Sequence, residues 1–420
     1  MQKPCYAPLY VLQRVAGFKT LKPHVMSATM TKARDVRPMP QLNRRTLLLS
    51  AVASPFVSRV DASETQSSQD VSPYRVQDPM AGYFDLAERR RVMRDMPSLG
   101  IIQARLRAME YSDCQSGRTV PVQDQTITIP SFYGDNEGWR KAVTPFRNIE
   151  DAVSNLAAGN LVSPERGYAD CLVDLLLRWA RRDALAKFNF STAYRQGWFQ
   201  VESTLFAIGH AMAAIRPDIL HRKDDLGTID AWLLRIARSH FAIPGSPGGT
   251  CCNNHFYRRA LYAAIVGVQT GDDALFQGGV GAIPLALSDS SSEGALLLEM
   301  KRGELSAHYQ NFALMYLVMI AEIAERQGYP MWDMQIDGKS LHTLVAFNNK
   351  VIADPNTVLK YASATEVSLR YQKDMQYFAW FEIYLSRFKN AQMEAWIATR
   401  RPMYNRSLGG HLTAYFYVDS

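Results

Sequence analysis

Helical periodicity dominates the chain beyond about residue 80. In 168–187, apolar residues recur at the i, i+3, i+4 spacing that places side chains on one face of an α-helix: Cys171, Leu172, Leu175, Leu176 and Trp179. The same spacing predicts helices at 204–215, 229–241, 254–270, 307–326, 340–352, 374–387 and 391–400. Strand-like alternation is confined to two short stretches, 125–130 and 411–418. Because strands and helices do not alternate repeatedly, we predict an all-α fold in a single domain, 81–420.

The N-terminal part differs from the rest of the chain. Arg44 and Arg45 precede a short apolar run, 47–53, and small residues follow near position 62, which is the layout of a cleaved export signal. The paired arginines suggest the twin-arginine route, and Met39 is a candidate start. We therefore predict a leader over 1–62, a flexible polar segment over 63–80, and a periplasmic or secreted protein. A buried N-terminal helix is the alternative for the apolar run.

The net charge of +7 belongs to the leader. Residues 1–62 contain ten Lys and Arg and two acidic residues, which leaves 37 basic and 38 acidic residues for 63–420. Affinity for a polyanion must therefore come from a local cluster of positive side chains. The sequence contains no basic stripe with interleaved aromatic residues, so we do not expect nucleic-acid binding. No run reaches the roughly 18 apolar residues that a membrane span requires, so we expect no such span.

Four cysteines follow the leader, an even number in a compartment predicted to be oxidising. They allow two disulfide bonds with three connectivities. We favour Cys114–Cys171 together with a bond between the neighbours Cys251 and Cys252. Four buried thiols are the alternative.

Three short segments carry side chains suited to chemistry: 251–257, 299–304 and 307–312. Asn254 and His255 lie at a loop-to-helix junction, where Asn253 or Asn254 could also cap a helix. Arg302 and Tyr309 are seven residues apart, which corresponds to two helical turns, or to a loop followed by one turn. Singly, such an arginine and tyrosine more often serve a surface and a core, so the argument depends on their occurring together.

The combination resembles the mannuronate-specific alginate lyases, polysaccharide lyase family 5. The resemblance rests on Asn-Asn-His-x-Tyr at 253–257, Met-Lys-Arg at 300–302 and Ala-His-Tyr-x-Asn at 307–311, in the family's order. It also includes Cys171 in a Leu/Trp helix, Phe-Ala-Trp at 378–380, Arg-Pro at 401–402 and Leu-Gly-Gly at 408–410. It implies an incomplete (α/α) toroid of paired helices and catalytic roles for Asn254, His255, Arg302 and Tyr309.

The resemblance implies β-elimination, which explains why these residue types are needed. Removal of the C5 proton of a uronate puts negative charge on its carboxylate, which Asn254 and Arg302 can neutralise by donating hydrogen bonds. Tyr309 would take this proton and pass it to the leaving O4. An unperturbed tyrosine has a pKa near ~10, and we expect Arg302 to lower it. His255 would neutralise the carboxylate or serve as the base for the opposite C5 configuration.

Substrate contacts are expected from aromatic, basic and amide side chains near these segments: Tyr133, Arg140, Trp198, Gln200, Tyr257, Arg258 and His308. The stretch 132–140 falls where the family has a mobile lid, with Gly134 and Gly138 as candidate hinges. The chain departs from the family at 256–258, which reads Phe-Tyr-Arg instead of Ser-Tyr-Trp, and its lid lacks the Lys-Pro-Tyr start. These departures leave polyglucuronate or another acidic exopolysaccharide open as the substrate.

Two other classes of protein remain open. A glycoside hydrolase needs two carboxylates flanking the bond, for which the sequence offers Glu202, Glu293, Glu299 and Asp333. A non-catalytic polysaccharide-binding protein would bind without cleavage. The histidines outside the three segments show no metal-ligand spacing, so we predict no metal and no cofactor.

Overall fold

The structure is a computed structural model that describes residues 74–188, 195–245 and 250–419. Its regular elements in these residues are helices, and strand-like pairing is limited to isolated bridges such as Ile127 with Phe188. No helix of this part of the chain has the length and apolar character to cross a membrane. The predicted leader, 1–62, lies outside the described residues.

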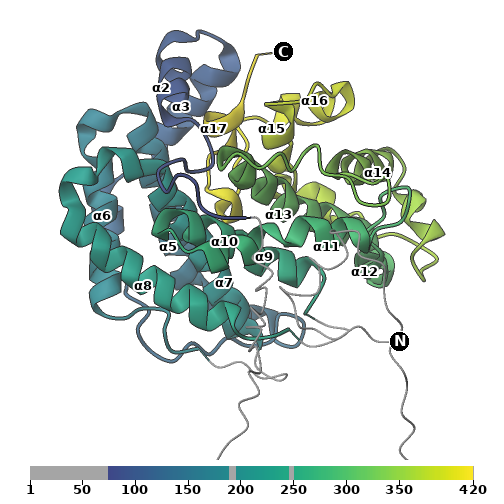
Figure 1. Cartoon of the computed structure of the whole chain (residues 1–420), viewed down its shortest axis with the longest axis horizontal. Helices are drawn as coiled ribbons and strands as arrows, with labels where there is room; N and C mark the ends of the chain where they lie inside the picture. Colours follow the sequence, from purple (N-terminus) through teal and green to yellow (C-terminus); the bar gives the residue numbers. More distant parts are fainter. Residues whose placement is uncertain (1–73, 189–194, 246–249, 420) are drawn as a thin grey trace, which may run out of the picture. The chain divides into compact units, whose positions relative to one another are not determined.

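The long helices form two layers. One layer consists of α5 (Asn136–Val162), α7 (Arg195–Ile215), α9 (Asn254–Thr270) and α13 (Ser306–Arg326), which contact one another in chain order. The second layer backs the first: α6 (Tyr168–Arg181) packs on α5, α8 (Lys223–Phe241) on α6 and α9, α10 (Asp273–Val280) on α9, and α14 (Leu341–Ala353) on α13. Figure 1 shows α6 and α8 on the outer side of α5 and α7.

Shorter elements continue the contacts from α13 back to α5. The helix α15 (Trp380–Leu385) packs on α13. Two further helices, α16 (Ala391–Ile397) and α17 (Leu412–Phe416), pack on α15. The helix α17 also contacts α2 (Leu86–Asp95) and α3 (Leu99–Tyr111), and α3 in turn packs on α5. The remaining helices are α4 (Cys114–Thr119), α11 (Ala282–Ser288) and α12 (Leu297–Met300). As a result, α7 and α13 are buried along most of their length.

The helix boundaries follow from local capping. The side chain of Asn253 accepts a hydrogen bond from the His255 amide and starts α9, and Gly271 ends it with φ of 68°. The predicted apolar face of 168–187 is buried, but α6 stops at Arg181 because Asp183 and Leu185 adopt left-handed backbone conformations.

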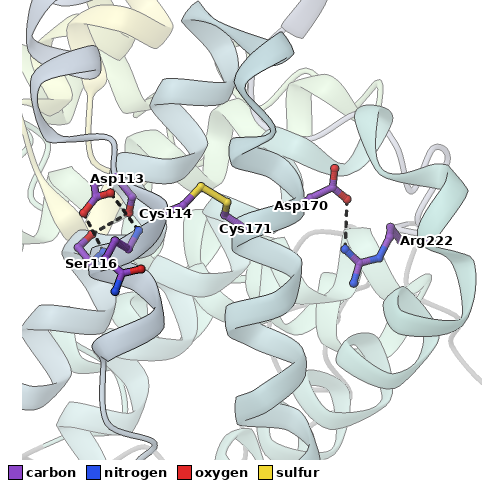
Figure 2. Close-up of a disulfide and its surroundings, with 7 residues drawn as sticks. Asp113, Cys114, Ser116, Asp170, Cys171 and Arg222 are labelled. Atoms are coloured by element: carbon purple, nitrogen blue, oxygen red, sulfur yellow. Dashed lines mark hydrogen bonds and ion pairs between the residues drawn. A yellow bond between two sulfur atoms is a disulfide. The ribbon is translucent and has the colours of Figure 1, made fainter.

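Both predicted disulfide bonds are present. The bond between Cys114 and Cys171 joins α4 to α6, beside the Asp113 side chain that caps α4, as Figure 2 shows. On the other side of α6, Asp170 accepts a hydrogen bond of 3.1 Å from Arg222. The short helix α4 is thereby fixed to the second layer.

Neither stretch of strand-like alternation forms a strand, in agreement with the predicted all-α fold. The helix α17 occupies most of 411–418, and all of its residues are buried. Within the described residues, the stretch 125–130 makes a single bridge, from Ile127 to Phe188. The flexible segment does not extend to residue 80: the Arg75 amide donates to the Tyr329 hydroxyl at 2.8 Å, and the Gln77 amide donates to Gln327 at 2.8 Å.

Candidate active site

The first helical residue of α9 is Asn254, whose side chain is fully buried. Because Asn253 supplies the cap, the Asn254 amide is not used for capping. The Asn254 backbone N–H donates to Glu299 Oε1 at 2.6 Å, and its side-chain Nδ2 donates to Glu299 Oε2 at 2.8 Å. Glu299 thus fixes both the position and the rotamer of Asn254, and one Nδ2 hydrogen of Asn254 remains for another acceptor.

Glu299 is itself fully buried at the end of α12. Burial raises the pKa of its carboxyl to about 7, although the hydrogen bonds from Asn254 and the charge of Arg302 oppose this rise. The carbonyl of Glu299 also accepts a hydrogen bond of 3.1 Å from the Arg302 amide. The same glutamate therefore links Asn254 to the turn that carries Arg302.

That turn connects α12 to α13. The Ser306 hydroxyl contacts the carbonyl oxygens of Met300 at 3.0 Å and Gly303 at 2.7 Å, and Gly303 adopts a φ of 59°. Tyr309 lies in the first turn of α13, so the spacing of seven is a loop followed by one helical turn. The guanidinium carbon of Arg302 lies 3.9 Å from the centroid of the Tyr309 ring, a cation–π contact.

The expected direction of the Tyr309 pKa was wrong. Burial raises the pKa of the Tyr309 hydroxyl to about 12, with a further contribution from the Tyr133 hydroxyl, and the charge of Arg302 only partly opposes this. Desolvation disfavours the phenolate more than the neighbouring guanidinium stabilises it. Tyr309 is therefore a neutral phenol at neutral pH.

His255 lies beside this group. Its ring stacks on Phe199 of α7 with the centroids 4.5 Å apart and the planes at 16°. The pKa of His255 is well below its ordinary value, first because the ring is buried and then because Arg258 and Arg302 are close. His255 is accordingly a neutral imidazole at neutral pH, and Arg302 supplies the positive charge among the four catalytic candidates.

The predicted lid contacts the site. The Tyr133 hydroxyl lies 3.5 Å from the Tyr309 hydroxyl, and the Phe132 ring packs edge-on against Trp139 at 4.8 Å. The lid prediction needs one correction: α5 begins at Asn136, so Gly138 lies in its first turn and donates to the capping Asp135 side chain. Gly138 is therefore part of a helix rather than a hinge. Arg140 is exposed in the same helix.

Three of the expected substrate contacts are buried. Trp198 and Tyr257 have exposed fractions of 0% and 1%, because both rings fill the interior between the helical layers. The amide of Gln200 is buried and donates to Glu150 Oε1 at 2.8 Å, so it is engaged within the protein. By contrast, His308 and Arg258 are partly exposed, and the His308 ring packs edge-on against Tyr377 at 4.8 Å.

The partly exposed side chains at the N-terminal ends of α7, α9 and α13 form what we call the catalytic face: Phe199, Ser203, His255, Arg258, His308, Tyr309 and Phe312. Contacts within it run from Phe199 to His255 and to Arg258, and from Tyr309 to Phe312. The N-terminus of a helix carries partial positive charge. The ends of these three helices thus favour an anionic ligand at this face.

Glu299 and Phe199 were not predicted as supporting residues of the site. The sequence placed Glu299 three residues before Arg302, but only the fold brings its carboxylate to Asn254.

A cavity of about 290 Å³ lies elsewhere, lined by residues around α2 and the end of α7, and none of the four catalytic candidates lines it. In the described residues, no group of three potential metal ligands occurs.

Comparisons with known proteins identify the family of the chain. The alginate lyase family matches residues 95–358. A polysaccharide lyase of Stenotrophomonas maltophilia strain K279a is 27% identical over 314 residues, which is 74% of this chain and 87% of that protein. An alginate lyase of Pseudomonas syringae pv. syringae strain B728a is 24% identical over 286 residues, 67% of this chain and 74% of that protein.

The similarity extends to solved structures. Alginate lyase A1-III of Sphingomonas species A1 superposes with a TM-score of 0.73 at 28% identity, over 82% of this chain and 98% of that chain. A histidine-to-alanine variant of A1-III complexed with a tetrasaccharide gives a TM-score of 0.74 at 29% identity, with the same coverage. The two helical layers described above agree with these neighbours. From its sequence and its fold, this chain belongs to the alginate lyase family, polysaccharide lyase family 5, and is a polysaccharide lyase with an α/α toroid fold.

Proposed function

We propose that the chain cleaves a β-1,4-linked polymer of uronic acids by β-elimination, with poly(β-D-mannuronate), as in alginate, as its substrate. The observation that supports this most directly is the placement of Arg302 against the Tyr309 ring, in the turn that Glu299 connects to Asn254. The charge of Arg302 also acts on the pKa of Glu299 and of His255, which supports a shared site for the guanidinium, the side-chain amide and the phenol.

The proposed reaction divides the work among these groups. Arg302 and the remaining Nδ2 hydrogen of Asn254 bind the carboxylate of the sugar that is attacked. As the C5 proton leaves, charge grows on this carboxylate, and each preorganised donor is worth about 2.7–4 kcal/mol in the transition state. The oxygen of ionised Tyr309 takes the C5 proton and delivers it to O4, so that the C4–O4 bond breaks and a C4–C5 double bond forms.

The role of Tyr309 as both base and acid fits mannuronate, in which the C5 hydrogen and O4 lie on the same side of the ring. Neutral His255 can donate one hydrogen bond to the carboxylate but adds no charge. Glucuronate shares the C4 and C5 configurations of mannuronate and differs at C2. Polyglucuronate is therefore the second candidate substrate, since the same groups serve the same reaction on it.

Three of the four candidate carboxylates for hydrolysis are otherwise engaged. Glu202 is buried and ion-paired with Arg258, Glu293 is ion-paired with Lys360 at the surface, and Glu299 accepts the bonds from Asn254. Hydrolysis requires one carboxyl to donate a proton to the glycosidic oxygen and another to assist water or attack the sugar. These pairings leave the elimination chemistry better supported than hydrolysis.

The proposal is tested with the chain from residue 63 onward on four polymers: polymannuronate, polyguluronate, polyglucuronate and hyaluronan. Elimination creates a double bond that absorbs ultraviolet light, whereas hydrolysis adds water and creates none. We expect absorbance to rise with polymannuronate. It should also rise with polyglucuronate if the enzyme does not distinguish the two configurations at C2. New reducing ends that appear without ultraviolet absorbance would show a hydrolase, and binding without either signal would show a binding protein.

We also infer that the chain is exported, because two disulfide bonds are compatible with an oxidising compartment. Fractionation of cells expressing the full sequence checks this. A chain beginning near residue 63 in the periplasm or the medium is expected, whereas a full-length cytosolic chain would contradict the inference.

A further inference from the structure

Arg258 occupies a distinctive place on the catalytic face. It follows His255 by three residues in α9, so the two side chains emerge on the same side of the helix, about 4.5 Å apart along its axis. Both contact the same aromatic ring: His255 stacks on Phe199, and the Arg258 guanidinium carbon lies 5.9 Å from the Phe199 centroid. Arg258 therefore lies directly beside the proposed site of proton transfer.

The guanidinium of Arg258 is held on two of its three nitrogens. Nε pairs with Glu202 at 2.6 Å, and Nη2 donates to the Ser203 hydroxyl at 2.7 Å and to the Phe199 carbonyl at 3.2 Å. Glu202 is fully buried and the Arg258 side chain is 14% exposed. Among the residues that the structure describes, no hydrogen bond or ion pair occupies Nη1. The group is thus a rigid fork with one donor nitrogen still available.

The local charge also favours an anion. Buried Glu202 is flanked by two arginines, Arg258 and Arg259, both of which oppose the effect of burial on its pKa. Burial nevertheless raises the pKa of Glu202 to about 7, so this carboxylate does not neutralise both guanidiniums at neutral pH. The charge of Arg258 reaches the neighbouring groups, since it lowers the pKa of His255 and opposes the raised pKa of Tyr377.

We propose that Nη1 of Arg258 binds the carboxylate of a sugar flanking the one that loses its C5 proton, so that the enzyme selects polymers with acidic sugars in adjacent positions. The inference rests on the proposed lyase function and extends it, because Arg302 and Asn254 bind the carboxylate of the reacting sugar. Poly(β-D-mannuronate) and polyglucuronate provide a second carboxylate beside the first. A polymer in which uronate alternates with a neutral sugar does not.

A purely structural role for Arg258 makes a different prediction. If its guanidinium only compensates the charge of Glu202, lysine at the same position should suffice, because an ammonium can pair with the same carboxylate. The substitution Arg258→Lys retains the charge and removes Nη1, which separates the two roles. The matched control is Arg259→Lys, because Arg259 is the next residue of α9 but is buried and lies over the Trp198 ring at 4.9 Å.

The experiment uses two synthetic mannuronate oligosaccharides that differ at one flanking sugar. One has carboxylates throughout, and in the other the flanking carboxylate is reduced to a primary alcohol; both flanking positions are made. We expect the unreduced oligosaccharide to be preferred by roughly tenfold or more in kcat/KM at one position, the range of a hydrogen bond to a charged group. Arg258→Lys should lose this preference through a raised KM with little change in kcat, and Arg259→Lys should keep it.

Each outcome decides the proposal. Equal kcat/KM values of the unsubstituted enzyme for the two oligosaccharides at both positions overturn it, even if Arg258→Lys fails to fold. A folded Arg258→Lys variant that keeps the full preference also overturns it. Dissociation constants measured in a Tyr309→Phe background test this inference separately from the reaction. If no polymer yields unsaturated product, the proposed lyase function fails. The Arg258 site is still supported in that case if the unreduced oligosaccharide binds more tightly and if Arg258→Lys removes this difference.

Discussion

At the scale of single residues, Glu299 is the residue on which the geometry of the candidate active site depends most. Its two carboxylate oxygens each accept one hydrogen bond from Asn254, and its backbone carbonyl accepts a hydrogen bond from the backbone N–H of Arg302. Burial of a carboxylate is costly unless its oxygens are hydrogen-bonded, and Asn254 donates to both oxygens of Glu299. Glu299 acts through Asn254 and is a positioning residue.

The substitution Glu299→Gln tests this role. Glutamine replaces one acceptor oxygen with an amino group, so it cannot accept both bonds from Asn254, and the Asn254 amide should turn. We expect kcat to fall by roughly tenfold or more, the range for misplaced donors, while the folded state persists. Steady-state kinetics and thermal unfolding measure both quantities. The control is Glu293→Gln at the surface, and an unchanged kcat in a folded Glu299→Gln variant would count against the role.

The raised pKa of Tyr309, about 12, predicts the pH dependence of the reaction. The base is the ionised phenol, so the competent fraction of the free enzyme grows tenfold per pH unit at any pH well below this pKa. We expect log kcat/KM to rise with a slope near one from about pH 6 to about pH 9. A plateau or decline that begins near neutral pH, in enzyme that stays folded, would contradict Tyr309 as the base.

The residues of the candidate site could be proposed from the sequence, but their electrostatics could not. The order of Asn254, His255, Arg302 and Tyr309 identified the group, because the resemblance depends on residue types in order. The direction of the Tyr309 pKa was wrong because burial depends on the lid and on neighbouring helices. The burial of Trp198 and Tyr257 was not predicted for a related reason: an aromatic side chain beside a candidate catalytic residue can face the interior just as well as the substrate.

At the scale of elements, boundaries were predictable where caps are local. The bounds of α9 match the predicted range 254–270, which begins beside the two candidate caps Asn253 and Asn254, and α13 begins within one residue of its expected start. The helix α5 was not predicted. It includes Pro145, a residue that normally breaks helices, and it is stabilised by tertiary contacts with α3, α6 and α7 that a local pattern does not contain.

The start of α5 allows a test of the lid. A Cβ atom on Gly138 would lie 2.1 Å from Asp135 Oδ2, so Gly138→Ala should displace the cap of α5. We expect a loss of about 1 kcal/mol in the free energy of unfolding, as for a lost cap, and a raised KM because Tyr133 lies in the adjoining turn. Urea denaturation and kinetics measure these effects.

The matched control for that variant is Gly227→Ala in α8, where an added Cβ meets nothing within 4 Å. This substitution should stabilise the protein by about 0.5–1 kcal/mol and leave KM unchanged. Equal effects of the two variants on KM would contradict a role of the 132–138 region at the site.

At the scale of the whole molecule, the fold class was predictable because helical periodicity extends over most of the chain. The strand-like alternation at 411–418 does not produce a strand, because α17 packs against both α15 and α3 and its residues are buried on every side. The connectivity of the disulfide bonds was favoured in advance and is confirmed.

The bond between Cys114 and Cys171 should contribute to the stability of the whole domain. Its sequence separation of 57 residues corresponds to about 4 kcal/mol of chain entropy in the unfolded state. Replacing both cysteines by alanine should lower the free energy of unfolding by that order in urea denaturation. Replacing Cys251 and Cys252, which are adjacent, should have a much smaller entropic effect. Equal losses for the two pairs would contradict this account.

The most direct test of the central claim is the ultraviolet absorbance of products formed from polymannuronate by the unsubstituted chain and by Tyr309→Phe. The account predicts that the unsubstituted chain produces oligosaccharides with a C4–C5 double bond. It also predicts that Tyr309→Phe folds and binds the polymer but produces none, because it lacks the group that moves the proton. Unsaturated product formed at a near-normal rate by Tyr309→Phe would contradict the account.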